Sequence, residues 1–310
     1  MIRRIFAIIL TAVLLSGCAG GSAGEQTAGY TFTDDLGRTV TVESCDRVAA
    51  LLGSFADIWH LAGGSVCASP DDAWEDFDLP MAPDAVNLGN TKSMSLESLL
   101  GAKPELVLAS TNTAQHVSWL DTLESAGITV AYFDVSDFDD YLRVLEICCR
   151  LAGNPERYSI YGTDVQKHIR SVLERNRDRE PQSVLVMRAS AASIRAKNSE
   201  GTVLGTMLRD FGCVNIADSQ ESLLENLSVE SILLLDPDKI FFIQTGNDMD
   251  AVKENVEAMF RENPLWQTLT AVQKGEVYFM EKRLYNLKPN ALWGEAYEKL
   301  EAILYGETES

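Results

Sequence analysis

The stretch from Asn154 to Glu180 constrains the fold more than any other, because its pattern predicts one long helix in the middle of the chain. Asn154 and Pro155 form a helix-start signal, a capping side chain followed by proline at the first helical position. Pro181 ends the helix, because a residue before proline is disfavoured in the helical region. The helix would be about 38 Å long at about 1.5 Å per residue. Apolar residues recur every three or four positions in one narrow stripe: Tyr158, Tyr161, Val165, Ile169 and Val172. A narrow stripe on a long charged rod predicts a strut between two bodies.

Strand and helix patterns alternate on both sides of this strut, which predicts mostly parallel sheets covered by helices. Before it we predict a hairpin over 30–42, strands over 47–52, 65–68, 106–109 and 129–133, and helices from 54 to 62 and over 95–100, 114–126 and 138–152. After it we predict strands over 183–187, 240–243 and 276–280, and helices over 202–211, 228–234, 249–262 and 291–304. Ser54 and Asp57 resemble a capping box for the first of these helices. The expected fold is α/β: two lobes, 30–153 and 181–310, each with a mostly parallel central sheet flanked by helices, bridged by one long α-helix over 154–180.

The two lobes share a sequence unit. Residues 95–107 match residues 228–240 at a constant offset of 133 positions without a gap. Each copy is predicted to contain a serine-capped helix with a glutamate at its second position, then proline and an acidic residue leading into an apolar strand.

The N-terminus is predicted to be a signal peptide over 1–17. Arg3 and Arg4 precede an apolar run too short for a comfortable membrane span. The run ends in Leu15-Ser16-Gly17-Cys18, which resembles a bacterial lipobox, so Cys18 is expected to be lipidated and 18–29 to be a flexible tether. The net charge of −20 becomes −22 without the signal peptide, which carries two arginines and no acid. Such acidity argues against nucleic acid and anionic lipid surfaces as partners. We therefore expect a protein outside the cytoplasmic membrane, held to it only by lipid.

Beyond Cys18, the chain has five cysteines, an odd number that leaves at least one unpaired in a monomer. They are Cys45, Cys67, Cys148, Cys149 and Cys213. No spacing among them indicates a metal site, so we interpret them as structural thiols.

Several motifs, in this order, resemble a known family: Thr33-Asp-Asp-Leu-Gly-Arg-Thr-Val-Thr41, both repeated units, Gly212-Cys-Val-Asn-Ile-Ala217, Asn263-Pro-Leu-Trp266, Ala271-Val-Gln-Lys-Gly-Glu-Val-Tyr278 and Leu287-Lys-Pro-Asn-Ala-Leu-Trp293. Together they resemble the ABC-transporter substrate-binding lipoproteins of the iron-siderophore, haem and cobalamin type, the helix-bridged class III periplasmic binding proteins. The resemblance covers nearly all of 30–305. It implies a monomeric binding protein rather than an enzyme, with no covalent cofactor, that delivers a metal chelate to an ABC permease and its ATPase.

The resemblance also implies a docking role for one glutamate on each lobe, since in this family these residues meet arginines of the permease. The matching positions are Glu97 and Glu230. A simpler interpretation is that a carboxylate in the first turn stabilises its helix by about 0.3–1 kcal/mol. The two interpretations are compatible.

The ligand is expected in the cleft, at loops that follow the carboxyl ends of strands. This nominates Ser54, Phe55, Trp74, Thr111 and Asn112 in the first lobe, and Arg188, Arg195, Lys197, Gln244, Arg283 and Tyr285 in the second. The basic residues favour an anionic ligand, because arginine matches carboxylate or phenolate oxygens. Solvated loop charges and ordinary aromatic packing are the alternatives. A ferric siderophore or haem fits such a cleft better than near-neutral cobalamin.

Other classes fit the sequence less well. A zinc or manganese receptor needs about three histidines and a carboxylate to converge, and the chain has only His60, His116 and His168. A lipid-anchored enzyme would need a catalytic motif, and we find no Gly-x-Ser-x-Gly, phosphate loop or His-Glu-x-x-His. The sequence does not identify the ligand.

Overall fold

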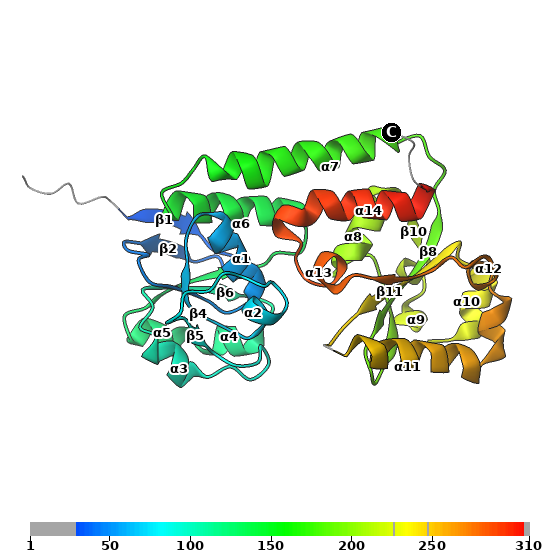
Figure 1. The fold of residues 1–310 in the computed structure, drawn as a ribbon, viewed down its shortest axis with the longest axis horizontal. Helices are drawn as coiled ribbons and strands as arrows, with labels where there is room; N and C mark the ends of the chain where they lie inside the picture. Colours follow the sequence, from blue (N-terminus) through cyan, green and yellow to red (C-terminus); the bar gives the residue numbers. More distant parts are fainter. Residues whose placement is uncertain (1–28, 226, 247, 307–310) are drawn as a thin grey trace, which may run out of the picture.

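The computed structural model describes residues 29–306 apart from 226 and 247, so the predicted signal peptide, Cys18 and nearly all of the tether lie outside the described residues. The chain forms two α/β lobes side by side, and one helix, α7 (Asp164–Arg175), runs along the top of both (Figure 1). The predicted fold class is confirmed. Within the described part of the chain no helix has the length and hydropathy needed to cross a membrane.

The first lobe is built on a five-stranded parallel sheet in the order β5-β4-β3-β6-β7. Its strands are β3 (Val48–Ala50), β4 (Val66–Ser69), β5 (Val86–Asn87), β6 (Leu106–Ser110) and β7 (Thr129–Phe133), and the hairpin is β1 (Tyr30–Thr33) with β2 (Thr39–Val42). Its helices are α1 (Gly53–Leu61), α2 (Asp72–Glu75), α3 (Leu96–Gly101), α4 (Ala114–Ser118), α5 (Leu120–Ser125) and α6 (Phe138–Leu151). Alternate residues of β6 enter two separate cores, as expected for a strand buried on both faces.

The predicted helix over 114–126 is instead two short helices that meet at Trp119. The hydroxyl of Tyr132 donates to the carbonyl of His116 at 2.6 Å. In a continuous helix, the carbonyl of His116 would accept a hydrogen bond from a backbone amide of the next turn. Here it accepts one from the buried Tyr132 hydroxyl, which favours a break in the helix.

The second lobe repeats the plan with four parallel strands in the order β10-β8-β11-β12 and one antiparallel edge strand, β9, beside β8. The strands are β8 (Ser183–Ala189), β9 (Ile194–Lys197), β10 (Val214–Asn215), β11 (Lys239–Gln244) and β12 (Val277–Met280). The helices are α8 (Val203–Asp210), α9 (Glu221–Glu225), α10 (Val229–Leu235), α11 (Met249–Glu262), α12 (Thr270–Lys274), α13 (Lys282–Tyr285) and α14 (Trp293–Tyr305), with 3-10 turns η2 (Ile216–Asp218), η3 (Pro264–Thr268) and η4 (Asn290–Leu292). The sequence predicts a cleft loop for Arg195 and Lys197, but pairing with β8 makes this segment a strand.

The bridge is shorter and less regular than predicted. It begins with a π-helical turn, η1 (Ser159–Thr163), and α7 ends at Arg175 rather than at Glu180. Gly162 lies in the π turn, where a Cβ would come within 3.1 Å of the Leu142 side chain on α6. The glycine thus allows the bridge to approach the first lobe closely.

Asn154 does not cap the bridge. Its amide donates instead to the carbonyl of Ala62 at 3.0 Å, and the guanidinium of Arg157 donates to the carbonyl of Leu61 at 2.6 Å. Both side chains therefore satisfy carbonyls at the end of α1 and fix the bridge to the first lobe.

The other end of the bridge is fixed to α14. Glu301, which is 3% exposed, accepts hydrogen bonds from the side chains of Arg175 and Asn176. Asn176 also donates to the carbonyl of Val172 at 2.8 Å. These bonds end α7 and attach it to the second lobe.

The sequence repeat is a structural repeat. The hydroxyls of Ser95 and Ser228 cap α3 and α10 by accepting from backbone amides three residues later. The residues before each proline, Lys103 and Asp236, both adopt positive φ, 50° and 34°. The acid after each proline accepts backbone amides at the start of the neighbouring strand: Glu105 from Asp46 and Arg47, and Asp238 from Ser183.

Candidate ligand-binding site

The lobes are joined by a buried polar contact. The carboxylate of Asp57 on α1 accepts hydrogen bonds from the guanidinium of Arg283 and the amide of Asn290, each at 2.9 Å. Asn290 also donates to the carbonyl of Ser54 at 3.0 Å. The predicted capping box is therefore wrong: α1 starts at Gly53 without a side-chain cap, and Asp57 binds the other lobe.

A second contact strengthens this junction. Lys282 donates to the carboxylate of Asp76 at 2.6 Å, and the guanidinium of Arg283 lies 4.3 Å from the ring centre of Phe77. Arg283, predicted to meet a ligand, is thus occupied in holding the lobes together. Burial raises the pKa of Asp57 although Asn290 and Arg283 lower it. Burial also raises the pKa of the neighbouring Asp72 to about 6.

Three predicted cations meet on one face of the second sheet. Arg188 lies opposite Arg195 in the β8–β9 ladder, and Lys197 lies opposite Val186 two positions away. Among the residues that the structure describes, none of the three has a carboxylate within ion-pair distance. The Nε atom of Arg188 is buried without a hydrogen-bond partner. Burial lowers the pKa of Arg188 and, together with the two arginines, that of Lys197.

Lys288 is a fourth cation that we did not nominate, although it belongs to the Leu287-Lys-Pro-Asn motif. Burial lowers its pKa, the carboxylates of Asp134, Asp140 and Asp137 raise it, and Arg188 lowers it. Lys288 is therefore close both to Arg188 and to acids of the first lobe. Arg188, Arg195, Lys197 and Lys288 are called the cation cluster below.

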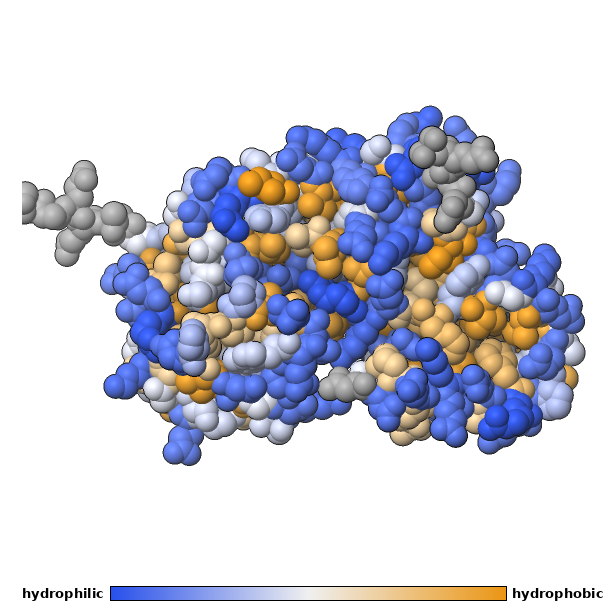
Figure 2. Space-filling model, in the orientation of Figure 1, coloured by the Kyte–Doolittle hydropathy of each residue, from blue (hydrophilic) through white to orange (hydrophobic). Residues whose placement is uncertain are grey.

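The first lobe presents polar and acidic groups at this boundary. Asn112, as predicted a residue after β6, donates its amide to Asp134 at 2.6 Å, and the hydroxyl of Ser136 also donates to Asp134. Figure 2 shows the surface indented between the lobes at the lower edge of the view. The cleft thus has an acidic and polar wall on one side and a basic wall on the other.

The remaining nominated residues lie elsewhere. Ser54 is buried at the junction and Trp74 is half-buried on α2. Gln244 pairs with Ala189 in the ladder, so its side chain lies on the sheet face opposite Arg188. Tyr285 is 2% exposed and its hydroxyl donates to the carbonyl of Ala296, which corrects the expectation that its ring offers contact area. Phe55 is likewise a core residue, while Thr111 is half-buried beside Asn112.

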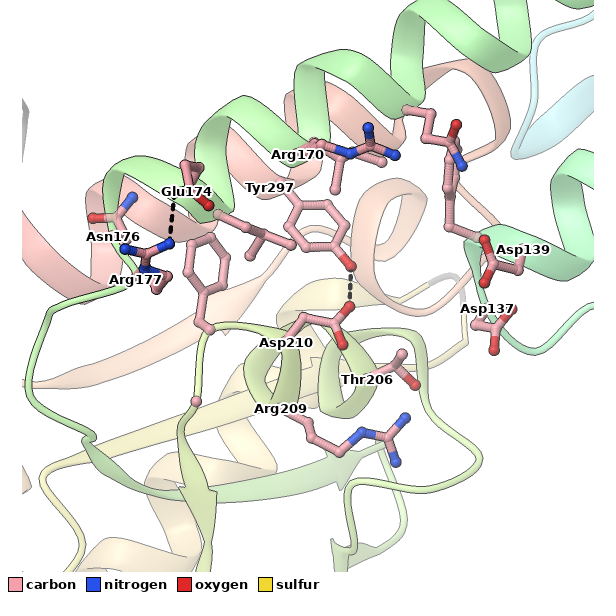
Figure 3. A pocket seen from close by; sticks show the side chains of 16 residues that line it. Asp137, Asp139, Arg170, Glu174, Asn176, Arg177, Thr206, Arg209, Asp210 and Tyr297 are labelled. Carbon is pink, nitrogen blue, oxygen red and sulfur yellow. Dashed lines mark hydrogen bonds and ion pairs between the residues drawn. The ribbon is translucent and has the colours of Figure 1, made fainter.

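A separate groove of about 520 Å³ lies under the bridge, between α7, α8 and the start of α6 (Figure 3). At its centre the hydroxyl of Tyr297 donates to Asp210 at 2.5 Å, and burial raises the pKa of Asp210. No nominated residue lines this groove. The groove is therefore separate from the residues nominated for ligand binding.

The histidines have separate surroundings. His116 is buried, its Nδ1 accepts from the amide of Ser110 at 3.0 Å, and burial lowers its pKa to about 4. His168 pairs with Glu298 at 2.7 Å on the bridge, and His60 is exposed near the end of α1. In the described part of the chain, no three His, Cys, Asp or Glu side chains form a group that could hold a metal ion.

Glu97 and Glu230 are exposed in the first turns of α3 and α10. Each helix leads through a short turn into a strand, α3 into β6 and α10 into β11. Because such a helix runs back along the strand that follows it, both glutamates are directed toward the sheet edge where the strands end, the edge that forms the cleft.

We predict that Arg283→Ala lowers the free energy of unfolding by about 2–4 kcal/mol at neutral pH, because Asp57 is left buried without its counter-charge. A raised folded-state pKa means that proton uptake favours the folded state, so this deficit should shrink as the pH falls from about 7 to about 5. Urea unfolding of the wild type and the variant at both pH values measures this loss of unfolding free energy. Arg195→Ala, an exposed cation without an ion pair, is the control and should change stability by less than about 0.5 kcal/mol. A pH-independent or negligible loss would contradict the assignment of this contact.

Comparison with known proteins agrees with this architecture. A family model described as periplasmic binding protein matches residues 48–284. The putative ABC transporter substrate-binding lipoprotein YhfQ of Bacillus subtilis (strain 168) is 23% identical over 322 residues, which cover 96% of this chain and 97% of that protein. The iron-uptake system-binding protein of the same organism is 25% identical over 275 residues, which cover 86% of this chain and 79% of that protein.

Among solved structures, Staphylococcus aureus SirA complexed with staphyloferrin B has a TM-score of 0.66 at 19% identity, and the match covers 89% of this chain and 97% of that one. The family match spans both lobes and the bridge. The chain therefore belongs to the periplasmic binding protein family.

Proposed function

We propose that this protein is an extracytoplasmic, lipid-anchored receptor that binds an anionic iron complex, a ferric siderophore or haem, in the interlobe cleft and delivers it to an ABC permease with its ATPase. The observation that carries the proposal is the cation cluster. Four cations without ion pairs to described residues gather at the cleft in a chain of net charge −20.

Bringing like charges together without counter-ions costs free energy, and burial of Arg188 and Lys288 increases the cost. An anionic ligand would offset this cost, because carboxylate and phenolate oxygens accept charge-assisted hydrogen bonds from arginine and lysine. The names of the relatives, an iron-uptake protein and a receptor complexed with staphyloferrin B, support an iron complex as the ligand. The scattered histidines give no support to a zinc receptor.

We predict that Arg188→Ala and Lys288→Ala each weaken binding of the ferric complex by about 1–3 kcal/mol per lost charged hydrogen bond, about 5- to 150-fold in affinity. Quenching of the intrinsic fluorescence of the five tryptophans measures this across ferric siderophores, haemin and cobalamin. Lys167→Ala, an exposed lysine of the bridge, is the matched control. Tight cobalamin binding that neither substitution changes would favour a cobalamin receptor instead.

Docking through Glu97 and Glu230 gives a separate prediction. Glu97→Arg together with Glu230→Arg should leave ligand affinity unchanged, because both side chains are exposed outside the cation cluster. Stimulation of the ATPase should collapse, since like charges facing each other at an interface cost several kcal/mol. If the double variant stimulates the ATPase normally, the two glutamates only stabilise their helices.

Anchoring is tested at Cys18, which lies outside the described residues. We expect Cys18→Ala to leave the protein unprocessed or released from the membrane, because lipidation needs the thiol. Fractionation after a high-salt wash, with Cys45→Ala as the control cysteine, distinguishes the outcomes. Normal processing and retention of the Cys18 variant would contradict the lipid anchor.

A further inference from the structure

The two docking glutamates occupy equivalent places, but their surroundings differ. The repeat offset pairs Glu97 with Glu230, Gly101 with Leu234 and Met94 with Leu227. Met94 is 5% exposed, and Gln115 on α4 donates to its carbonyl. Leu227 instead lines an open groove. Charge alone would therefore not distinguish the two lobes for a partner, whereas apolar contact would.

Leu234 is 88% exposed, the largest exposure among the large apolar side chains of the described residues. It follows Glu230 by one helical turn, so both lie on the same face of α10. Leu235 and Leu265 are also exposed, at 38% and 40%, and Leu265 belongs to η3, which contacts α10. Figure 2 shows apolar side chains on this corner of the second lobe.

A groove of about 490 Å³ adjoins Glu230. Its wall is partly apolar, with Leu227, Met259 and the buried Trp266, and the carboxylates of Glu230 and Glu262 lie on its rim. Neither carboxylate forms an ion pair with a described residue. The groove also includes the turn between β8 and β9, at the cleft end of the strands. An acidic rim beside an apolar wall fits a cationic side chain next to an apolar one.

We propose that this corner, formed by Glu230, Leu234, Leu265 and the groove, receives a segment of the permease that carries a cationic and an apolar side chain, and that it fixes which lobe meets which part of the permease. The inference rests on the proposed function. The two glutamates are equivalent and cannot by themselves distinguish the lobes. The apolar contact can, because specificity needs a difference between two otherwise similar surfaces.

The test uses the full chain loaded with the ferric complex and its permease–ATPase complex in nanodiscs, with affinity and ATPase stimulation as readouts. Leu234→Ser removes the exposed side chain, and Ala258→Trp fills the groove. Each should weaken docking by about tenfold, since a buried leucine contributes that much. Ligand affinity should stay unchanged, which also shows that the variants fold. Val214→Ser, at a 58% exposed position on β10, is the matched control and should have no effect.

The outcomes separate the two proposals. This inference is overturned if both Leu234→Ser and Ala258→Trp dock as well as the wild type while the reversal of Glu97 and Glu230 abolishes docking. That result would leave the proposal of docking through the glutamates standing. An equal loss in Val214→Ser would also overturn it, because the effect would not be specific to this corner. If the double glutamate reversal docks normally, docking through Glu97 and Glu230 is wrong, whereas loss of docking in Leu234→Ser and Ala258→Trp would still support this corner.

Discussion

The arrangement of the lobes depends on the buried contact between Asp57, Arg283 and Asn290. It connects α1 of the first lobe to the segment between β12 and α14, so residues far apart in sequence hold one junction. The bridge completes the frame, because Arg157 attaches one end to α1 and Glu301 attaches the other to α14. Two lobes fixed at both places can open only slightly, as expected for a binding protein with a helical bridge.

The charge distribution across the cleft follows from this frame. The lobes bring Asp134, Asp137 and Asp140 of the first lobe toward Lys288 of the second, which also lies near Arg188. These carboxylates lie too far away for ion pairs with the cluster, so its charge is only partly balanced. We infer that an anionic ligand completes the balance and that the second lobe supplies most of its binding free energy.

Much of the fold could be predicted from local patterns. The alternation of apolar and polar residues predicted the hairpin, and the alternation of strand and helix patterns predicted the parallel sheets. The repeat at an offset of 133 residues predicted two serine-capped helices, which the structure confirms. What local patterns missed depends on tertiary contacts. Asn154 caps α1 rather than the bridge, Tyr285 is buried against α14, and β9 is a strand because it pairs with β8. Of the candidate site, Arg188, Arg195, Lys197 and Asn112 were nominated because they follow predicted strands, although the structure places the three cations within β8 and β9. Lys288 was missed because it approaches Arg188 only through the tertiary path of the segment between α13 and α14, which no local pattern predicts.

The most direct test of the central claim, that the cation cluster holds an anionic iron complex between the lobes, is to locate the iron. Anomalous diffraction at the iron edge, from crystals grown with a ferric siderophore or haemin that binds, gives the metal position without a model of the ligand. We predict one peak in the cleft, with ligand oxygens within hydrogen-bond distance of Arg188 and Lys288. A peak in the groove under α7, or on the outer surface away from the cluster, would contradict the claim.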